Sequence, residues 1–189
     1  MTGIILAGGR NLRMGENKAF LTIQGERLID RTQALLVQLF EEILLVTNSP
    51  LDYVDLKVRT VADLLPGKGS LGGIYTGLFH ASASHAFVVA CDMPFLNRPL
   101  IQYLQGLAKG YDIVIPRTPD GLQPLHAIYS QRCLPFMEKL LQRDNLRILD
   151  FFPKVRKREV LPEEMLPFDP ELKSFMNINT PEDLARLRE

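Results

Sequence analysis

The residues with the clearest capacity for chemistry lie in a glycine-rich segment near the N-terminus, residues 6–18. Gly8 and Gly9 directly follow an apolar run, and backbone N–H groups at glycines can surround an anion closely. Arg13 and Lys18 add a guanidinium fork and an ammonium, both suited to phosphate oxygens. The spacing matches neither the dinucleotide fingerprint nor the Walker A loop. We therefore predict a phosphate site here; the alternative is a tight strand exit beside two surface cations.

The second candidate is Asp92, which follows the apolar residues 86–90 where the chain turns toward Pro94. A carboxylate at a strand end can hold Mg²⁺ that bridges substrate phosphates, and this ion needs only one or two carboxylates. The alternative is an aspartate that caps a turn. Cys91 is interpreted as a small buried residue and not as a nucleophile, because the charge of Asp92 would raise its pKa.

Two further features each have more than one interpretation. Asp63 precedes the glycine-rich residues 67–73, and its carboxylate could bind a nucleobase edge, bind a ribose hydroxyl or cap a turn. Gly72 and Gly73 begin a predicted helix, where close packing of helix on sheet or contact with a base would require glycine. We favour packing for this pair.

His126 and two asparagines are weaker candidates. His126 lies among apolar neighbours and is interpreted as a hydrogen-bonded core group, not as a catalytic base. Asn177 and Asn179 alternate along the chain and would therefore share one face of a strand. That face could bind a polar ligand or could simply lead into a helix capped by Thr180.

Composition narrows the function classes. The 189 residues contain 22 Lys and Arg against 22 Asp and Glu, so no broad basic field favours nucleic acid as a partner. The two cysteines form no CxxC pair, which argues against structural zinc and a disulfide framework. The sequence has no basic leader and no apolar run of about 18 residues. We expect a cytoplasmic protein that does not contact a membrane.

Strands and helices alternate along the sequence. The apolar patterns predict strands at 3–7, 42–47, 86–90, 111–115 (ended by Pro116), 123–129 and an exposed edge strand at 155–161, and helices at 28–40, 72–82, 99–109, 131–142 and after Thr180. This order predicts one domain over residues 1–189, with a three-layer, Rossmann-like α/β fold and a mainly parallel sheet. Ligands bind at the carboxyl ends of such strands. We expect convergence there of Gly8-Gly9, Asn48, Asp92 and Pro116-Arg117.

The pattern of these segments is similar to that of a known family. The chain resembles the molybdenum cofactor guanylyltransferases (MobA-type), a family of nucleotidyltransferases, in segments that follow the same order: 6–9, 13–18, Asn48, Asp63, 70–74, 91–94 and 177–183. The resemblance covers almost the whole chain. Ser70-Leu71-Gly72-Gly73 stands where many members have Pro-Leu-Ala-Gly.

The resemblance implies roles for individual residues. Asp92 would hold Mg²⁺, and Arg13 and Lys18 would join it in neutralising charge during catalysis. Asn177 and Asn179 would lie near the acceptor. The residues implied to contact GTP are Leu6, Ala7, Gly8, Lys18, Asn48, Asp63 and Asp92.

The implied reaction transfers GMP from GTP to the phosphate of molybdopterin, or of Mo-molybdopterin, with release of pyrophosphate. Such chemistry needs positioning and charge neutralisation rather than a covalent nucleophile. The alternatives are a cytidylyltransferase for the same cofactor, a sugar-phosphate nucleotidyltransferase and a non-enzymatic nucleotide-binding adaptor module. Implied protein partners are other cofactor-biosynthesis proteins and molybdoenzyme chaperones.

Overall fold

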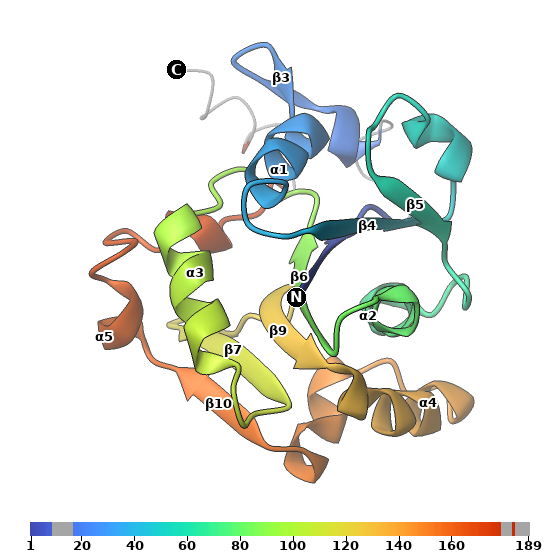
Figure 1. The fold of residues 1–189 in the computed structure, drawn as a ribbon, viewed down its shortest axis with the longest axis vertical. Coiled ribbons are helices and arrows are strands. Elements are labelled where there is room, and N and C mark those ends of the chain that lie inside the picture. Colours follow the sequence, from blue (N-terminus) through green and yellow to red (C-terminus); the bar gives the residue numbers. More distant parts are fainter. Residues whose placement is uncertain (9–16, 179–182, 184–189) are drawn as a thin grey trace.

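The computed structural model describes residues 1–8, 17–178 and 183 (Figure 1). Its main sheet has the strand order β10-β7-β9-β6-β1-β4-β5, with β8 paired to β7. The strands of this sheet are β1 (Thr2–Leu6), β4 (Glu42–Thr47), β5 (Arg59–Ala62), β6 (His85–Ala90), β7 (Ile113–Thr118), β8 (Gly121–Leu122), β9 (His126–Ser130) and β10 (Lys157–Val160). A separate hairpin joins β2 (Thr22–Ile23) to β3 (Glu26–Arg27).

The main sheet is mostly parallel, as the sequence predicts. β1 pairs in parallel with β4 and β6, β4 with β5, and β7 with β10. β9 is inserted between β6 and β7 and runs antiparallel to both. The predicted α/β architecture with a mainly parallel sheet is therefore confirmed, and β9 makes the sheet mixed.

Helices cover both faces of the sheet in three layers (Figure 1). Ile5 of β1 packs in one apolar cluster with residues of α1 (Leu28–Leu36) and α3 (Arg98–Leu107). Ile4 and Leu6 point the other way, into a second cluster with α2 (Gly69–His80) and α4 (Leu134–Gln142). Strands covered on both faces read as continuous apolar runs, which is why β1 and β6 were visible in the sequence. The short helix α5 (Pro162–Met165) follows β10.

The glycines of α2 allow this helix to lie directly on β1. A Cβ at Gly77 would stand 2.7 Å from Cγ2 of Ile4, and one at Gly73 would stand 3.3 Å from Cδ2 of Leu6. The packing interpretation is thus confirmed for Gly73, whereas a Cβ at Gly72 would stand 2.9 Å from Cβ of Lys68 and 3.2 Å from the carbonyl oxygen of Leu65 and not against the sheet. The helix begins at Gly69, three residues before the predicted start, because glycines inside it hid the helical pattern.

Several predicted boundaries are wrong. The helix predicted at 28–40 ends at Leu36, and β5 was not predicted because Arg59, Thr60 and Ala62 leave one strongly apolar residue in this edge strand. Pro116 does not end β7, which continues to Thr118. The carbonyl of Pro116 accepts from the N–H of Gln123, on the side of the strand away from β10. The nitrogen of Pro116 lies on that same side, so the proline removes no hydrogen bond from the pairing with β10.

Other boundaries agree closely. The helix predicted at 99–109 is α3, and Asn97 caps it by accepting from the N–H of Leu100 at 2.9 Å. A 3₁₀ turn, η3 (Gln131–Cys133), precedes α4 in the region predicted as one helix. The predicted helix start at Thr180 lies outside the described residues. No helix in the described part of the chain is long and apolar enough to cross a bilayer.

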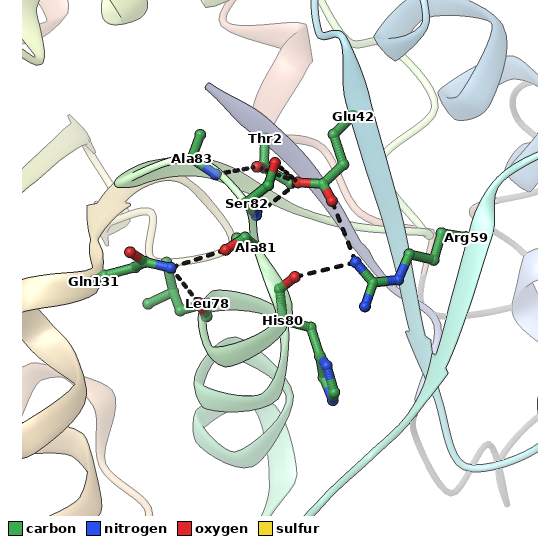
Figure 2. Close-up of polar contacts among 9 residues, drawn as sticks. All are labelled: Thr2, Glu42, Arg59, Leu78, His80, Ala81, Ser82, Ala83 and Gln131. Atoms are coloured by element: carbon green, nitrogen blue, oxygen red, sulfur yellow. Dashed lines mark hydrogen bonds and ion pairs between the residues drawn. The ribbon is translucent and has the colours of Figure 1, made fainter.

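At the amino ends of the strands, hydrogen bonds from polar side chains connect the sheet to the C-terminal end of α2 and the segment that follows it (Figure 2). Oε2 of Glu42 accepts hydrogen bonds from Oγ1 of Thr2 at 2.7 Å and from the N–H and Oγ of Ser82 at 2.9 and 2.7 Å. Gln131 donates through Nε2 to the carbonyls of Leu78 and Ala81, at 3.1 and 2.9 Å. These bonds satisfy carbonyls at the C-terminal end of α2 that have no partner within the helix.

Glu42 gives the first testable prediction. Burial would raise the pKa of this carboxyl, but hydrogen bonds from Ser82 and Thr2 and the charge of Arg59 bring it below its ordinary 4.5. A lowered pKa means that the ionised group stabilises the fold at neutral pH and that this stability is lost as pH falls below 4.5. We expect Glu42→Gln to lower the free energy of unfolding by about 1–3 kcal/mol at pH 7.

Urea unfolding of both proteins from pH 7 to pH 3 measures the effect. The difference between them should shrink as pH falls and the wild-type carboxyl is protonated. A difference that stays constant over this range would show that the charge of Glu42 is not responsible.

Candidate active site

A cleft opens at the carboxyl ends of the central parallel strands. It lies where β1, β4 and β6 end and where α2 begins, at the edge opposite to the Glu42 network. The lining residues come from these strand ends and from the segments that follow or face them: Leu6, Ala7, Gly8, Asn17, Lys18, Val46, Thr47, Asp63, Gly69, Ser70, Gly73, Ala90, Cys91, Asp92 and Leu125.

The register of the three strands explains why polar residues meet here. Leu6 of β1 is paired with Val46 of β4 and with Ala90 of β6. Two residues further along the three strands stand Gly8, Asn48 and Asp92, which therefore leave the sheet at the same level. Gly8 and Asp92 line the cleft as expected, whereas Asn48 is not among the lining residues and Gly9 lies outside the described residues.

Lys18 and Asp92 form an ion pair in the cleft. Nζ of Lys18 is 3.4 Å from Oδ2 of Asp92, and the two side chains are only 14% and 19% exposed. Lys18 begins the 3₁₀ turn η1 (Lys18–Phe20), which Asn17 caps by accepting from the N–H of Ala19. A phosphate entering the cleft would meet a fixed ammonium, the backbone of Gly8 and a carboxylate able to hold a cation. This is the combination that triphosphate binding requires.

Asp63 also lines the cleft, and it caps a turn as well. Its Oδ1 accepts from Oγ1 of Thr76 at 2.8 Å and from the N–H of Leu65 at 3.1 Å. Its own N–H donates to the carbonyl of Thr47. The turn interpretation is confirmed through Oδ1, and the same bonds fix the carboxylate at the wall of the cleft.

Other predicted residues lie at the margin or elsewhere. Asn48 is exposed beside Gly8, and its Nδ2 would lie 3.5 Å from a Cβ placed there. Asn177 is exposed and joins the site through the next residue, Ile178, whose N–H donates to the carbonyl of Asp92 at 2.9 Å. Arg13 and Asn179 lie outside the described residues.

The end of β7 does not reach the cleft, contrary to expectation. Pro116 and Arg117 are absent from its lining, and Arg117 instead forms an ion pair with Glu159 of β10 at 2.6 Å. The reason is the insertion of β9 between β6 and β7, which separates their ends by two strand spacings, about 10 Å.

Sequence reasoning missed several lining residues. Thr47 ends β4 and could have been found by the rule that located Asn48. Leu125 had no such signal, because it precedes β9 and lines the cleft only since that strand runs in the reverse direction. Asn17 lies within the glycine-rich segment but was not singled out.

Two groups that could have suggested covalent or acid–base chemistry belong to the core. Burial, with a smaller contribution from the charge of Asp92, raises the pKa of the Cys91 thiol to about 12. His126 is completely buried between the rings of Phe87 and Phe175, at 5.1 and 4.8 Å between centroids. Neither ring nitrogen has a hydrogen-bond partner in the described part of the chain, so the predicted hydrogen bond is wrong but the core placement is right.

The ligands available for a metal are carboxylate oxygens. The described residues hold no cluster of three or more His, Cys, Asp or Glu side chains that could form a complete metal cage. Asp92 supplies one carboxylate to the cleft, and Asp63 lines the cleft as well. This arrangement fits a hard divalent cation that takes its remaining ligands from substrate phosphates and water.

Comparison with known proteins agrees with this geometry. A sequence model of the MobA-like NTP transferase domain matches residues 3–156. The chain belongs to the MobA-like NTP transferase family. A full-length relative, the molybdenum cofactor guanylyltransferase of Desulfosudis oleivorans, is 39% identical over 188 residues, covering 98% of this chain and 93% of the relative.

Solved structures of MobA-like and related proteins share the fold. The molybdopterin-guanine dinucleotide biosynthesis protein A of Archaeoglobus fulgidus is 29% identical with a TM-score of 0.88, covering 100% of this chain and 97% of the other. A Mycobacterium tuberculosis protein, solved as a complex with manganese, is 18% identical with a TM-score of 0.67, covering 99% and 96%. At that identity the second likeness concerns the fold alone.

The buried imidazole of His126 leads to a prediction about how the free energy of unfolding of this MobA-like chain depends on pH. Burial lowers the pKa of His126 from 6.5 to about 3, against a small opposing effect of Asp169. Between these two pH values His126 is protonated in the unfolded chain but neutral in the native state. The free energy of unfolding therefore falls as pH drops from 6.5 toward 3. At pH 5 the loss is about 2 kcal/mol. We expect His126→Leu to remove this part of the pH dependence.

Unfolding in urea at pH 8 and pH 5 checks the expectation. At pH 8 the imidazole is neutral in both states, and the variant should be as stable as wild type within about 1 kcal/mol, because two unpaired buried nitrogens are lost. At pH 5 the variant should be the more stable protein. Equal losses for both proteins between the two pH values would exclude His126 as the source.

Proposed function

We propose that this chain is a molybdenum cofactor guanylyltransferase, which transfers GMP from GTP to the phosphate of molybdopterin or Mo-molybdopterin and releases pyrophosphate. The observation that carries the proposal is the meeting of Gly8, Lys18 and Asp92 in one cleft of a chain 39% identical to a named guanylyltransferase. Asp63 and Asn48 are assigned to the nucleotide with Leu6 and Ala7.

The mechanism rests on charge and position. Lys18 holds the triphosphate through its ammonium, and Arg13 adds a second cation from the glycine-rich segment. Mg²⁺ held by Asp92, when bound, supplies neutralisation of the charge that builds up on the phosphates. The backbone N–H groups that follow β1 orient the phosphate chain for in-line attack. The acceptor phosphate is already ionised near neutral pH, so no general base is needed.

The remaining assignments divide the chain by function. The N-terminal half binds the nucleotide, and the C-terminal half, with Asn177 and Asn179, binds the acceptor, within one domain over residues 1–189. The connection of Ile178 to the carbonyl of Asp92 supports this, since it brings the acceptor side next to the phosphate side. We place the enzyme in the cytoplasm, where cofactor-biosynthesis proteins and molybdoenzyme chaperones would supply its acceptor and receive its product.

Asp92→Asn tests the metal role. The amide keeps the size of the side chain but removes the charge, so we expect kcat to fall about 10²-fold or more while the unfolding midpoint changes little. Release of pyrophosphate from GTP with molybdopterin as acceptor measures turnover. Asp120→Asn, in the exposed turn between β7 and β8, is the matched control and should keep full activity. Turnover within tenfold of wild type would remove Asp92 from the metal site.

Calorimetric titration with GTP, CTP, ATP and UTP in the presence of Mg²⁺ tests the nucleotide. We expect GTP to bind most tightly. A preference for CTP would support the cytidylyltransferase alternative instead. Binding of GTP without pyrophosphate release would support the non-enzymatic adaptor, and transfer to a sugar phosphate in place of molybdopterin would support the third alternative.

A further inference from the structure

Tyr53 connects the two ends of the glycine-rich segment. It closes the 3₁₀ turn η2 (Pro50–Tyr53), which follows β4, and its side chain is 1% exposed. Its hydroxyl accepts a hydrogen bond from Nδ2 of Asn17 at 2.9 Å and donates one to the carbonyl of Ala7 at 3.4 Å. Ala7 and Gly8 precede residues 9–16, and Asn17 directly follows them. One phenol therefore joins both stems.

The directions of these hydrogen bonds are fixed by their neighbours. The side-chain oxygen of Asn17 accepts from the N–H of Ala19, so its amide nitrogen must face Tyr53. The phenol then has its single proton available for the carbonyl of Ala7. Burial raises the pKa of Tyr53 above its ordinary 10, so the hydroxyl keeps that proton at any physiological pH.

The ring of Tyr53 holds the second stem from another side. Its centroid lies 5.0 Å from that of Phe20, the last residue of η1. Lys18 is the first residue of η1, between Asn17 and Ala19. Both the ring and the hydroxyl of Tyr53 thus fix the short turn that carries the ammonium facing Asp92.

We propose that Tyr53 is a positioning residue for triphosphate binding: by tying Ala7 to Asn17, its hydroxyl sets the backbone of the first stem and the ammonium of Lys18 in place before the nucleotide arrives. This inference rests on the proposed function. It does not place Tyr53 in contact with substrate. Its effect falls on the phosphates and not on the base or the acceptor, since both stems serve the phosphate side of the cleft.

Tyr53→Phe is the direct test, because the ring and its contact with Phe20 remain. Loss of the hydroxyl leaves the stems less ordered, and binding must then order them. We expect the KM for GTP and the Kd for Mg²⁺–pyrophosphate to rise about three- to tenfold, with kcat and the KM for molybdopterin nearly unchanged. A role in packing alone would lower the unfolding midpoint without this selective change, so assays are run well below that midpoint.

Two further variants sharpen the test. Tyr103→Phe removes a hydroxyl that donates from α3 to Oε1 of Glu164 in α5, and no described residue of α3 lines the cleft, so this variant should leave the KM for GTP unchanged. Asn17→Ser keeps a capping oxygen but is too short to reach Tyr53. It should raise the same constants. The double variant with Tyr53→Phe should be no worse than the more affected single variant, because both substitutions remove the same hydrogen bond between Asn17 and Tyr53.

The outcomes separate the two proposals. If wild type transfers GMP and Tyr53→Phe has the same KM for GTP and the same Kd for pyrophosphate, the positioning role is wrong and the proposed function stands. Additive effects in the double variant would also overturn it. If wild type binds neither GTP nor pyrophosphate, the proposed function fails and the role of Tyr53 fails with it.

Discussion

The structure depends on the parallel alignment of three buried strands, β4, β1 and β6. Because their hydrogen-bond register is continuous, the residues that leave these strands do so at one height and on one edge. Gly8, Asn48 and Asp92 leave their strands near each other because of that register. The helices then need only to cover the two faces, and the segments after the strands can supply the ligands for phosphate and metal.

Much of this arrangement could be predicted from the sequence. β1, β4 and β6 are buried on both faces and therefore read as unbroken apolar runs followed by Gly, Asn and Asp. The direction of β9 could not be predicted, since an apolar run looks the same in either orientation. For that reason Arg117 was expected in the cleft and is found beside Glu159. β5 could not be predicted either, because an exposed edge strand needs few apolar residues.

For the candidate site, the glycine-rich segments identified Lys18 and Asp63 and a strand end identified Asp92, but none of these patterns identified the residues that hold them. Tyr53 and Thr76 act through hydrogen bonds to groups 46 and 13 residues away in sequence, and such pairings exist only once the register and the helix placement are set. Their side chains carry no local signal of a site. A motif can thus predict which groups meet a ligand, while the network that orients them needs the fold.

The close contact between α2 and β1 also limits how this cleft can evolve. Of the helix residues on its wall, Gly73 is pressed against Leu6 and Gly69 has a φ of +58°, so neither readily accepts a side chain. Ser70, which is exposed, is the remaining position of α2 on that wall within the described chain. On this wall, a change of nucleotide preference through a new side chain of α2 would therefore have to occur at Ser70. A library of substitutions at Ser70 would test every side chain that α2 can place there.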